Sequence, residues 1–174
     1  FFDALPIKQF LKKEKKWYEK YVNFINNKKL EYLDVPFDMQ KFEKKIKFKI
    51  SHNQTFIEYS PLASKYLKTI INKIKLNNGG ILIIDYAYFE KEMKNTLQAV
   101  SKHKYCNVLK GFRNADITYN ISFNLINKII KKLGPCSSLS TTQKKFLTKL
   151  GILNRAEMLS KNMVFSKKAD IYFR

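Results

Sequence analysis

The chain has 174 residues, and its 34 Lys and Arg against 14 Asp and Glu give a formal net charge of +20. Hydrophobic residues make up 45% of the sequence and aromatic residues 14%. This excludes a disordered polybasic tail, because such tails lack the apolar surface for a core. No apolar run approaches the roughly 18 residues of a membrane-spanning helix. We therefore expect one folded domain over residues 1–174 and no membrane span.

The positive charge comes almost entirely from lysine, with 31 Lys and three Arg. Arginine is the residue that binds guanine or phosphate through two parallel hydrogen bonds, so its scarcity argues against sequence-specific readout of nucleic acid. A chain of this charge still binds polyanions at low salt. We expect nucleic-acid binding to be non-specific, and a lysine-rich nucleic-acid-binding domain stays open as an alternative.

The first third of the chain has the features of a strand exit followed by a hairpin. Residues 1–6 are apolar with one acid and a proline, which predicts the end of a buried strand and the turn that leaves it. Aromatic and β-branched residues on both sides of Asn26-Asn27 predict a hairpin over residues 17–33. Residues 34–55 are lysine-rich and predict a connection with one short strand at residues 46–50.

Residues 60–86 predict a helix followed by a central strand. Ser60-Pro61 is a helix cap followed by proline at the first helical position, and apolar residues then recur at three- and four-residue spacing to Ile74. Residues 77–80, Asn-Asn-Gly-Gly, end the helix, with glycine expected in the left-handed position. The apolar run of residues 81–84 predicts a buried strand that ends at Asp85, the repeating part of an α/β sheet.

Helices are predicted for the rest of the chain, residues 122–174. One runs from Ser122 to Leu133 and ends at Gly134-Pro135. A second covers residues 141–150 and is closed by Gly151, and a third begins at Asn154 as its cap, with Glu157 three positions on.

Two acids follow predicted strand ends, where ligands bind in open α/β sheets. They are Asp3, beside the bulky Phe1-Phe2 pair, and Asp85, for which a cap beyond the strand is an equal alternative. His52 and His103 lie far apart without Cys, His or Asp at ligand spacing, so we expect no metal site. Cys106 and Cys136 lack the spacing of a disulfide or metal motif.

Six phrases occur in order along the chain. They are Phe1-Phe2-Asp3-Ala4-Leu5-Pro6, Tyr59-Ser60-Pro61, Gly79-Gly80-Ile81-Leu82-Ile83-Ile84-Asp85-Tyr86, Thr96-Leu97-Gln98-Ala99-Val100 with His103, Ala115-Asp116-Ile117-Thr118, and Thr142-Gln143-Lys144-Lys145-Phe146-Leu147 closed by Leu150-Gly151-Ile152. Together they resemble one family, the MidA-like class I S-adenosylmethionine (SAM)-dependent methyltransferases. The resemblance implies an α/β Rossmann-like fold, the C-terminal half of a methyltransferase domain with an inserted β-hairpin. Phe1-Phe2 would then lie at the exit of its fourth strand, and residues 81–85 would be its fifth.

The resemblance also implies that the SAM-binding half is missing. Members carry a glycine-rich loop and an acidic ribose contact upstream of the phrase that opens this chain, and this sequence has no Gly-x-Gly. SAM is thus the implied cofactor, with its binding residues unassigned, and we expect the lone chain to be inactive and to aggregate or form a homodimer. Four departures from the family pattern concern polar or loop positions: Ala87, Arg113, Asn120 and Ser122.

By resemblance, Asp3 is the carboxylate that holds a substrate guanidinium, and His103 orients the substrate or acts as a base. A loop histidine with a structural role is an equal alternative for His103. The implied substrate-binding residues are Phe2, Asp85, Gln98, Asp116 and Gln143. For Asp116, together with Thr118, a structural turn or cap is the favoured alternative, and Gln143 could equally complete a helix start.

The implied activity is methylation of an arginine in a protein substrate, with a subunit of respiratory complex I as the expected target. The expected location is the bacterial cytoplasm or the mitochondrial matrix. A non-catalytic remnant or interaction module is the main alternative.

Overall fold

The fold was obtained as a computed structural model, which describes residues 1–25, 29–111, 114–134 and 136–161. The chain forms two compact units, residues 1–138 and residues 139–174. Each unit is described by itself below. Within the described ranges, no helix is both long and apolar enough to cross a bilayer.

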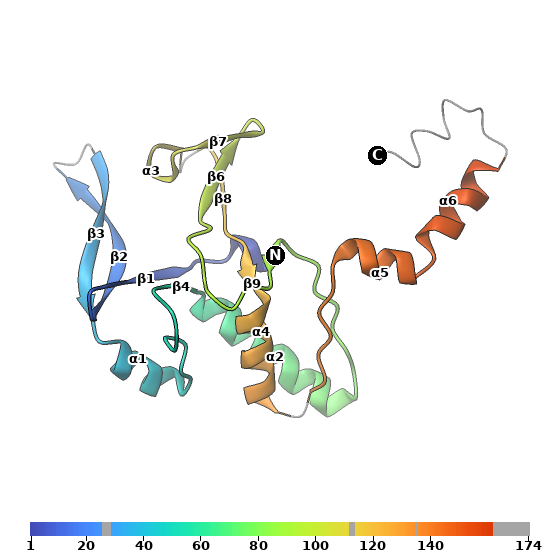
Figure 1. The fold of residues 1–174 in the computed structure, drawn as a ribbon, viewed down its shortest axis with the longest axis horizontal. Coiled ribbons are helices and arrows are strands. Elements are labelled where there is room, and N and C mark those ends of the chain that lie inside the picture. Colours follow the sequence, from blue (N-terminus) through green and yellow to red (C-terminus); the bar gives the residue numbers. More distant parts are fainter. Residues whose placement is uncertain (26–28, 112–113, 135, 162–174) are drawn as a thin grey trace. The chain divides into compact units, whose positions relative to one another are not determined.

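A four-stranded antiparallel sheet with the order β3-β2-β1-β4 forms one side of the first unit (Figure 1). Its strands are β1 (Lys8–Lys13), β2 (Lys16–Ile25), β3 (Lys29–Phe37) and β4 (Phe56–Tyr59). The predicted hairpin is confirmed as β2 and β3, which pair from Ile25↔Lys29 to Trp17↔Phe37. It is longer than predicted, and its Asn26-Asn27 turn lies outside the described residues.

Helix α1 (Met39–Ile46) occupies the stretch predicted as a connection. Its cap is Asp38, whose Oδ1 accepts a hydrogen bond from Lys41 N at 2.9 Å. The predicted strand at residues 46–50 is wrong, because the helix runs to Ile46 and Lys47 closes it in the left-handed conformation with φ 53°. A helix forms here because the segment is amphipathic. The apolar side chains of α1 recur at helical spacing and pack on the sheet.

The sheet is covered on both faces near β1 and β4. Phe10 and Ile57 are cross-strand neighbours, and both are fully buried. The centroid of the Phe10 ring lies 4.6 Å from that of the Phe37 ring and 5.3 Å from that of the Phe42 ring on α1. Because successive strand residues alternate between faces, Gln9 and Glu58 project to the opposite face, where they are also buried. One face is therefore an aromatic core and the other a polar one.

Two helices that contact each other build a second core. They are α2 (Pro61–Asn77) and α4 (Phe123–Leu133) (Figure 1). Both predicted starts are confirmed: Ser60 Oγ accepts from Ala63 N at 3.1 Å, and Ser122 Oγ accepts from Leu125 N at 3.3 Å. The helices enclose a cluster that also takes in Phe2, from the short 3₁₀ turn η1 (Phe2–Ala4), and Tyr119.

The chain leaves α2 differently from the prediction. Asn78, not a glycine, adopts the left-handed conformation that closes the helix, with φ 49°. The prediction of a strand at residues 81–84 is wrong, because this segment pairs with no strand of the described residues and a strand exists only with a hydrogen-bonded neighbour. Pairing begins just beyond it, where β5 (Ala87–Tyr88) lies parallel to β9 (Ile121–Ser122).

A second small sheet of order β7-β6-β8 follows in the first unit. It consists of β6 (Gln98–Ser101), β7 (Lys104–Cys106) and β8 (Asp116–Thr118), and a short helix α3 (Val108–Gly111) separates the last two. The expectation of a turn or cap at Asp116 and Thr118 is wrong, since both lie in β8 paired with β6.

The described part of the second unit consists of α5 (Gln143–Lys149) and α6 (Ile152–Ser160). Thr142 caps α5, and Gly151 follows it in the left-handed conformation with φ 81°. The prediction of Asn154 as the cap of the last helix is wrong, because Gly151 O already accepts the first helical bond from Arg155 N at 3.0 Å.

Candidate functional site

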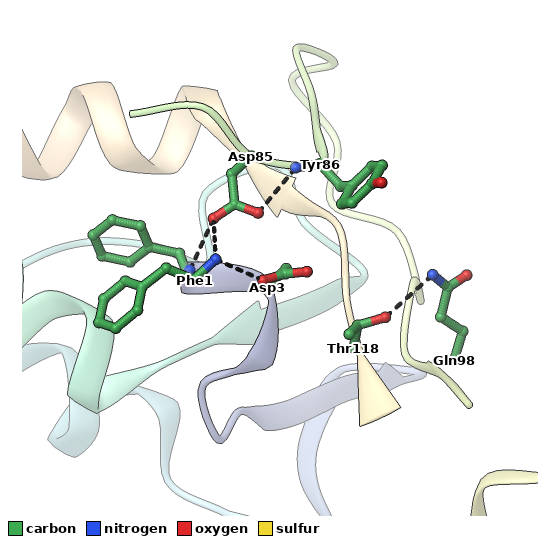
Figure 2. A network of polar contacts seen from close by, with 7 residues as sticks. Phe1, Asp3, Asp85, Tyr86, Gln98 and Thr118 are labelled. Atoms are coloured by element: carbon green, nitrogen blue, oxygen red, sulfur yellow. Dashed lines mark hydrogen bonds and ion pairs between the residues drawn. The ribbon is translucent and has the colours of Figure 1, made fainter. Parts of the chain in front are cut away.

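Two carboxylates converge at the beginning of the chain (Figure 2). Asp85 Oδ2 accepts from the backbone nitrogens of Phe1 at 3.1 Å and Phe2 at 2.8 Å, and its Oδ1 accepts from Tyr86 N at 2.9 Å. Asp3 Oδ1 lies 2.9 Å from Phe1 N. The side chain of Asp85 is 3% exposed and that of Asp3 is 15% exposed. Asp85 thus caps backbone nitrogens with both oxygens, and Asp3 is the carboxylate of the pair that solvent can reach.

The backbone of η1 attaches this pair to β8 and its neighbour β6. Asp3 O accepts from Tyr119 N at 3.0 Å, directly after β8. Thr118, the last residue of β8, is paired with Gln98, whose Nε2 donates to Thr118 Oγ1 at 3.3 Å (Figure 2). The structure therefore brings Asp3, Asp85 and Gln98 to one region, with the buried ring of Phe2 in the core beneath them.

The other predicted site residues lie elsewhere. His103 is an exposed residue in the turn between β6 and β7, with φ 61°, at the far end of β6 from Gln98. Asp116 is exposed at the start of β8, two positions and about 7 Å along the strand from Thr118. Gln143 is the first residue of α5 in the second unit.

A buried carboxylate that sequence reasoning missed organises the neighbouring loop. Glu58 on β4 is 5% exposed and accepts from Gln9 Nε2 at 2.8 Å, Thr96 N at 3.0 Å, Thr96 Oγ1 at 2.5 Å and Leu97 N at 3.2 Å. These bonds fix the residues that lead directly into Gln98. The signal in the sequence is one acid among the apolar residues 56–59.

A small pocket is lined by Glu58 and by residues that carry hydroxyl groups, among them Ser60, Tyr88, Tyr119 and Ser122. Burial is the main cause that raises the pKa of Tyr119 to about 12, and the negative charges of Glu58, Asp85 and Asp3 act in the same direction. Burial also raises the pKa of Tyr88. Both phenols are therefore hydrogen-bond donors at neutral pH, and no residue of this pocket was predicted as a site residue from the sequence.

The described residues do not fit a nucleotide cradle. Such a cradle is a glycine-rich loop that leads into the N-terminus of a helix. Gly79 and Gly80 instead follow the C-terminal end of α2, and Gly134 follows that of α4. Gly151 precedes α6 without a second glycine beside it. In the parts of the chain described here, there is also no cluster of His, Cys, Asp or Glu that could hold a metal ion.

Comparison with known protein families gives a match over residues 1–142, to the family described as "Putative S-adenosyl-L-methionine-dependent methyltransferase". The chain belongs to this family. The predicted resemblance is thereby confirmed, and SAM is the cofactor of the family.

Curated relatives carry the name of an arginine methyltransferase. The mitochondrial protein arginine methyltransferase NDUFAF7 homolog of Caenorhabditis elegans is 27% identical over 165 residues, which cover 91% of this chain and 38% of the relative. NDUFAF7 of Xenopus tropicalis is 27% identical over 173 residues, covering 91% of this chain and 36% of the relative. The chain thus spans well under half the length of these relatives.

Two solved structures from Burkholderia thailandensis share the fold. One has a TM-score of 0.74 at 19% identity and covers 98% of this chain and 47% of that chain. The other, bound to S-adenosyl-homocysteine, has a TM-score of 0.73 at 19% identity and covers 98% and 46%. The predicted α/β, class I methyltransferase-like fold is confirmed.

The structure gives a physical reason why two departures from the family pattern are tolerated. Ser122, where the resemblance implies aspartate, caps α4, and serine and aspartate are equally suited to that position. Asn120, where it implies histidine, is held through its backbone nitrogen, which donates to Thr96 Oγ1 at 2.9 Å. Ala87 lies in β5, and Arg113 lies outside the described residues.

Proposed function

We propose that this chain supplies the substrate-binding part of a SAM-dependent protein arginine methyltransferase. The family assignment and the names of the curated relatives support this proposal. A mitochondrial location and a complex I subunit as the substrate belong to the same proposal. The SAM-binding residues are expected from another part of the enzyme, because the described glycines form no glycine-rich loop at a helix N-terminus.

The partly exposed carboxylate of Asp3 is the observation that carries the proposal. A guanidinium group has a pKa above about 12 and arrives positively charged. A carboxylate binds it through charge-assisted hydrogen bonds and can take two of its N–H groups at once. Asp85 engages backbone nitrogens with both oxygens, whereas Asp3 binds Phe1 N through Oδ1 and keeps part of its surface open. Asp3 therefore binds and orients the guanidinium, and positioning of this kind supplies much of the rate enhancement of a transfer reaction.

Gln98 and Thr118 are proposed to line the same site. Their side chains are hydrogen-bonded to each other beside the segment that carries Asp3 (Figure 2). Glu58 acts as a positioning residue, since its bonds to Thr96 and Leu97 fix the approach to Gln98. A role for His103 as a base requires that the β6–β7 turn, which carries it, reaches the bound substrate.

The test is transfer of a radiolabelled methyl group from SAM to an arginine-containing peptide. The enzyme is this chain joined to the part of the Caenorhabditis elegans relative that it does not cover. Asp3→Asn is expected to lower kcat/KM by about 100-fold or more, because it removes the charge that meets the guanidinium. Glu31→Gln, which neutralises a partly exposed carboxylate that pairs with Lys29 on β3, is the matched control and is expected to change kcat/KM less than about twofold.

The alternatives give different results in the same assay. A joined protein that binds SAM and methylates lysine or a small molecule contradicts the arginine assignment. One that binds SAM without any transfer favours the non-catalytic remnant. Affinity for nucleic acid that disappears as salt is added and does not depend on sequence reflects charge alone. Affinity that persists in salt and depends on sequence favours a nucleic-acid-binding domain.

A further inference from the structure

The β2–β3 hairpin is much longer than the helix that packs on its base (Figure 1). Strand β2 has ten residues and β3 has nine, which corresponds to a length of about 30 Å. Helix α1 has eight residues and is only about 12 Å long. Its apolar side chains share a cluster with Trp17 and Phe37, which pair at the base of the hairpin. The aromatic core therefore reaches only the base of this face of the hairpin.

The outer part of the same face is apolar although it is open to solvent. It carries Tyr21 and Ile25 of β2 and Leu33 and Val35 of β3, because residues two apart in a strand share a face. Tyr21 and Leu33 are cross-strand neighbours and are 46% and 48% exposed, and Ile25 and Val35 are 38% and 36% exposed. We name these four residues the open hairpin face. A sheet face that stays in water normally carries polar side chains, so this pattern is typical of a surface that another molecule covers.

The charged side chains on this face already have partners of opposite sign. Lys29 Nζ lies 2.6 Å from Glu31 Oε1, and Lys8 pairs with Glu19. Residues 16–37 contain four Lys and three acids, a net charge of +1, so the rest of the chain carries +19 of the total of +20. An acidic protein, a nucleic acid or an anionic membrane would find its opposite charge outside the hairpin. The open hairpin face therefore suits an occupant that is apolar and electrically neutral.

A second copy of this chain meets both requirements. In a two-fold dimer the same patch of both chains meets itself, and the cores of such interfaces are apolar and poor in charge. Contact between two open hairpin faces covers Tyr21 and Leu33 of each copy and buries no charge that lacks its counter-ion. The excess lysines lie outside the hairpin sequence, and physiological salt screens repulsion between exposed charges beyond about 8 Å.

We propose that the open hairpin face is the interface of a homodimer, in which the hairpins of two copies pack face to face. The proposal is independent of the proposed function, because the hairpin contact involves none of the residues assigned to substrate binding.

The test uses the joined protein described above, in which this chain is linked to the part of the Caenorhabditis elegans relative that it does not cover. Analytical ultracentrifugation over a concentration series measures the dissociation constant of the dimer. Hydroxyl-radical footprinting measures how accessible the rings of Tyr21 and Tyr32 are to solvent. Tyr32 lies on the opposite face of the same hairpin and serves as an internal reference.

We expect a dimer with a dissociation constant of about 10 μM or lower. Modification of Tyr21 should fall by about threefold or more on dimerisation, because the core of an interface excludes water, whereas Tyr32 should not change. Addition of NaCl should not weaken the dimer, since the interface contains no attraction between opposite charges of the two copies.

Charge inserted on the open hairpin face is expected to abolish the dimer. The double variant Tyr21→Glu, Leu33→Glu should raise the dissociation constant by about 100-fold or more, because it buries unpaired acids in both copies. The matched control is Val22→Glu, Tyr32→Glu, a cross-strand pair on the opposite face that is 54% and 44% exposed. It should change the constant by less than about threefold. The circular dichroism of both double variants should match the wild type, since all four side chains are exposed.

Three results would overturn the proposal. They are a joined protein that stays monomeric up to about 0.1 mM, equal effects of the two double variants, and a dimer in which Tyr21 is as accessible as in the monomer. A monomer with a protected Tyr21 would identify another part of the same enzyme as the occupant. A dimer that forms as expected but transfers no methyl group to arginine contradicts the proposed function and supports the hairpin interface.

Discussion

The four-stranded sheet and residues 81–85, which we call the uncovered segment, are both apolar in sequence, yet only the sheet forms strands. In the sheet, Phe10 pairs with Ile57 across the strands and both are fully buried. In the uncovered segment, Ile83 is packed but Leu82 and Ile84 are exposed, and no strand of the described residues pairs with the backbone.

The difference shows that apolar character specifies burial, whereas strand formation needs a neighbour for the backbone. Strands β1, β2 and β3 follow one another through short connections, so each finds a neighbour nearby in sequence, and β4 then pairs with β1 from beyond α1. A parallel strand needs a neighbour that is distant in sequence or supplied by another polypeptide. The two regions should therefore differ sharply in what each side chain contributes to stability.

Truncation of a core residue is expected to give the largest effect. Phe10→Ala removes a ring that contacts Phe37 and Phe42, and it should lower the free energy of unfolding by about 3–5 kcal/mol. Leu82→Ala in the uncovered segment, where the side chain is 64% exposed, should change it by less than about 0.5 kcal/mol. Urea unfolding followed by circular dichroism measures both changes. Equal losses would contradict the view that Leu82 is uncovered.

Loss of the buried carboxylate of Glu58 is expected to have the next largest effect. Glu58→Ala leaves the amide of Gln9 and the backbone nitrogens of Thr96 and Leu97 without this acceptor. Each buried donor without a partner costs about 1–3 kcal/mol, so we expect a loss of about 3 kcal/mol in urea unfolding. Amide exchange at residues 96–97 should accelerate as well. Glu31→Ala on the exposed hairpin is the control, and a comparable loss there would contradict the prediction.

The pH dependence contributed by Tyr119, which packs in the same cluster as Ile83, is expected to be the smallest effect. Its pKa is raised to about 12 in the folded protein, whereas an unfolded tyrosine has a pKa of about 10. The folded state therefore holds this proton more strongly, and the stabilisation is present below pH of about 10 and is lost as the pH rises towards 12.

The measurement is urea unfolding of the wild-type protein and Tyr119→Phe between pH of about 9 and 12. The wild type should lose about 1–2.7 kcal/mol more stability over this interval than the variant. Tyr105→Phe, at a residue 78% exposed on β7, should follow the wild type. Parallel curves for all three proteins would show that Tyr119 titrates normally.

Much of the local structure was predictable because its causes lie within a few residues. The starts of α2 and α4 follow from Ser60 and Ser122, whose hydroxyl groups bind nearby backbone nitrogens. The hairpin follows from alternating β-formers on both sides of a turn. The predictions failed where alternatives compete locally: Asn78 took the left-handed position next to two glycines, and Gly151 capped α6 ahead of Asn154.

The site was predictable in part, for a similar reason. Asp3, Asp85 and Gln98 were named from short phrases, and the structure places them in one region. Glu58 and Tyr119 were missed, because their importance comes from burial between segments far apart in the chain, and a single sequence does not show that burial. Whether His103, Asp116 or Gln143 acts on a substrate stays a prediction.

By itself, the sequence determined the family, the helix starts, the hairpin and the acids that follow the apolar runs, since capping, periodicity and short motifs are local properties. Only the folded chain shows that Asp85 binds backbone nitrogens with both oxygens, whereas Asp3 keeps a small part of its carboxylate accessible to solvent. It also decided that residues 81–85 lack a neighbour in the described chain. Both outcomes depend on contacts between distant segments, and these form only when the chain is folded.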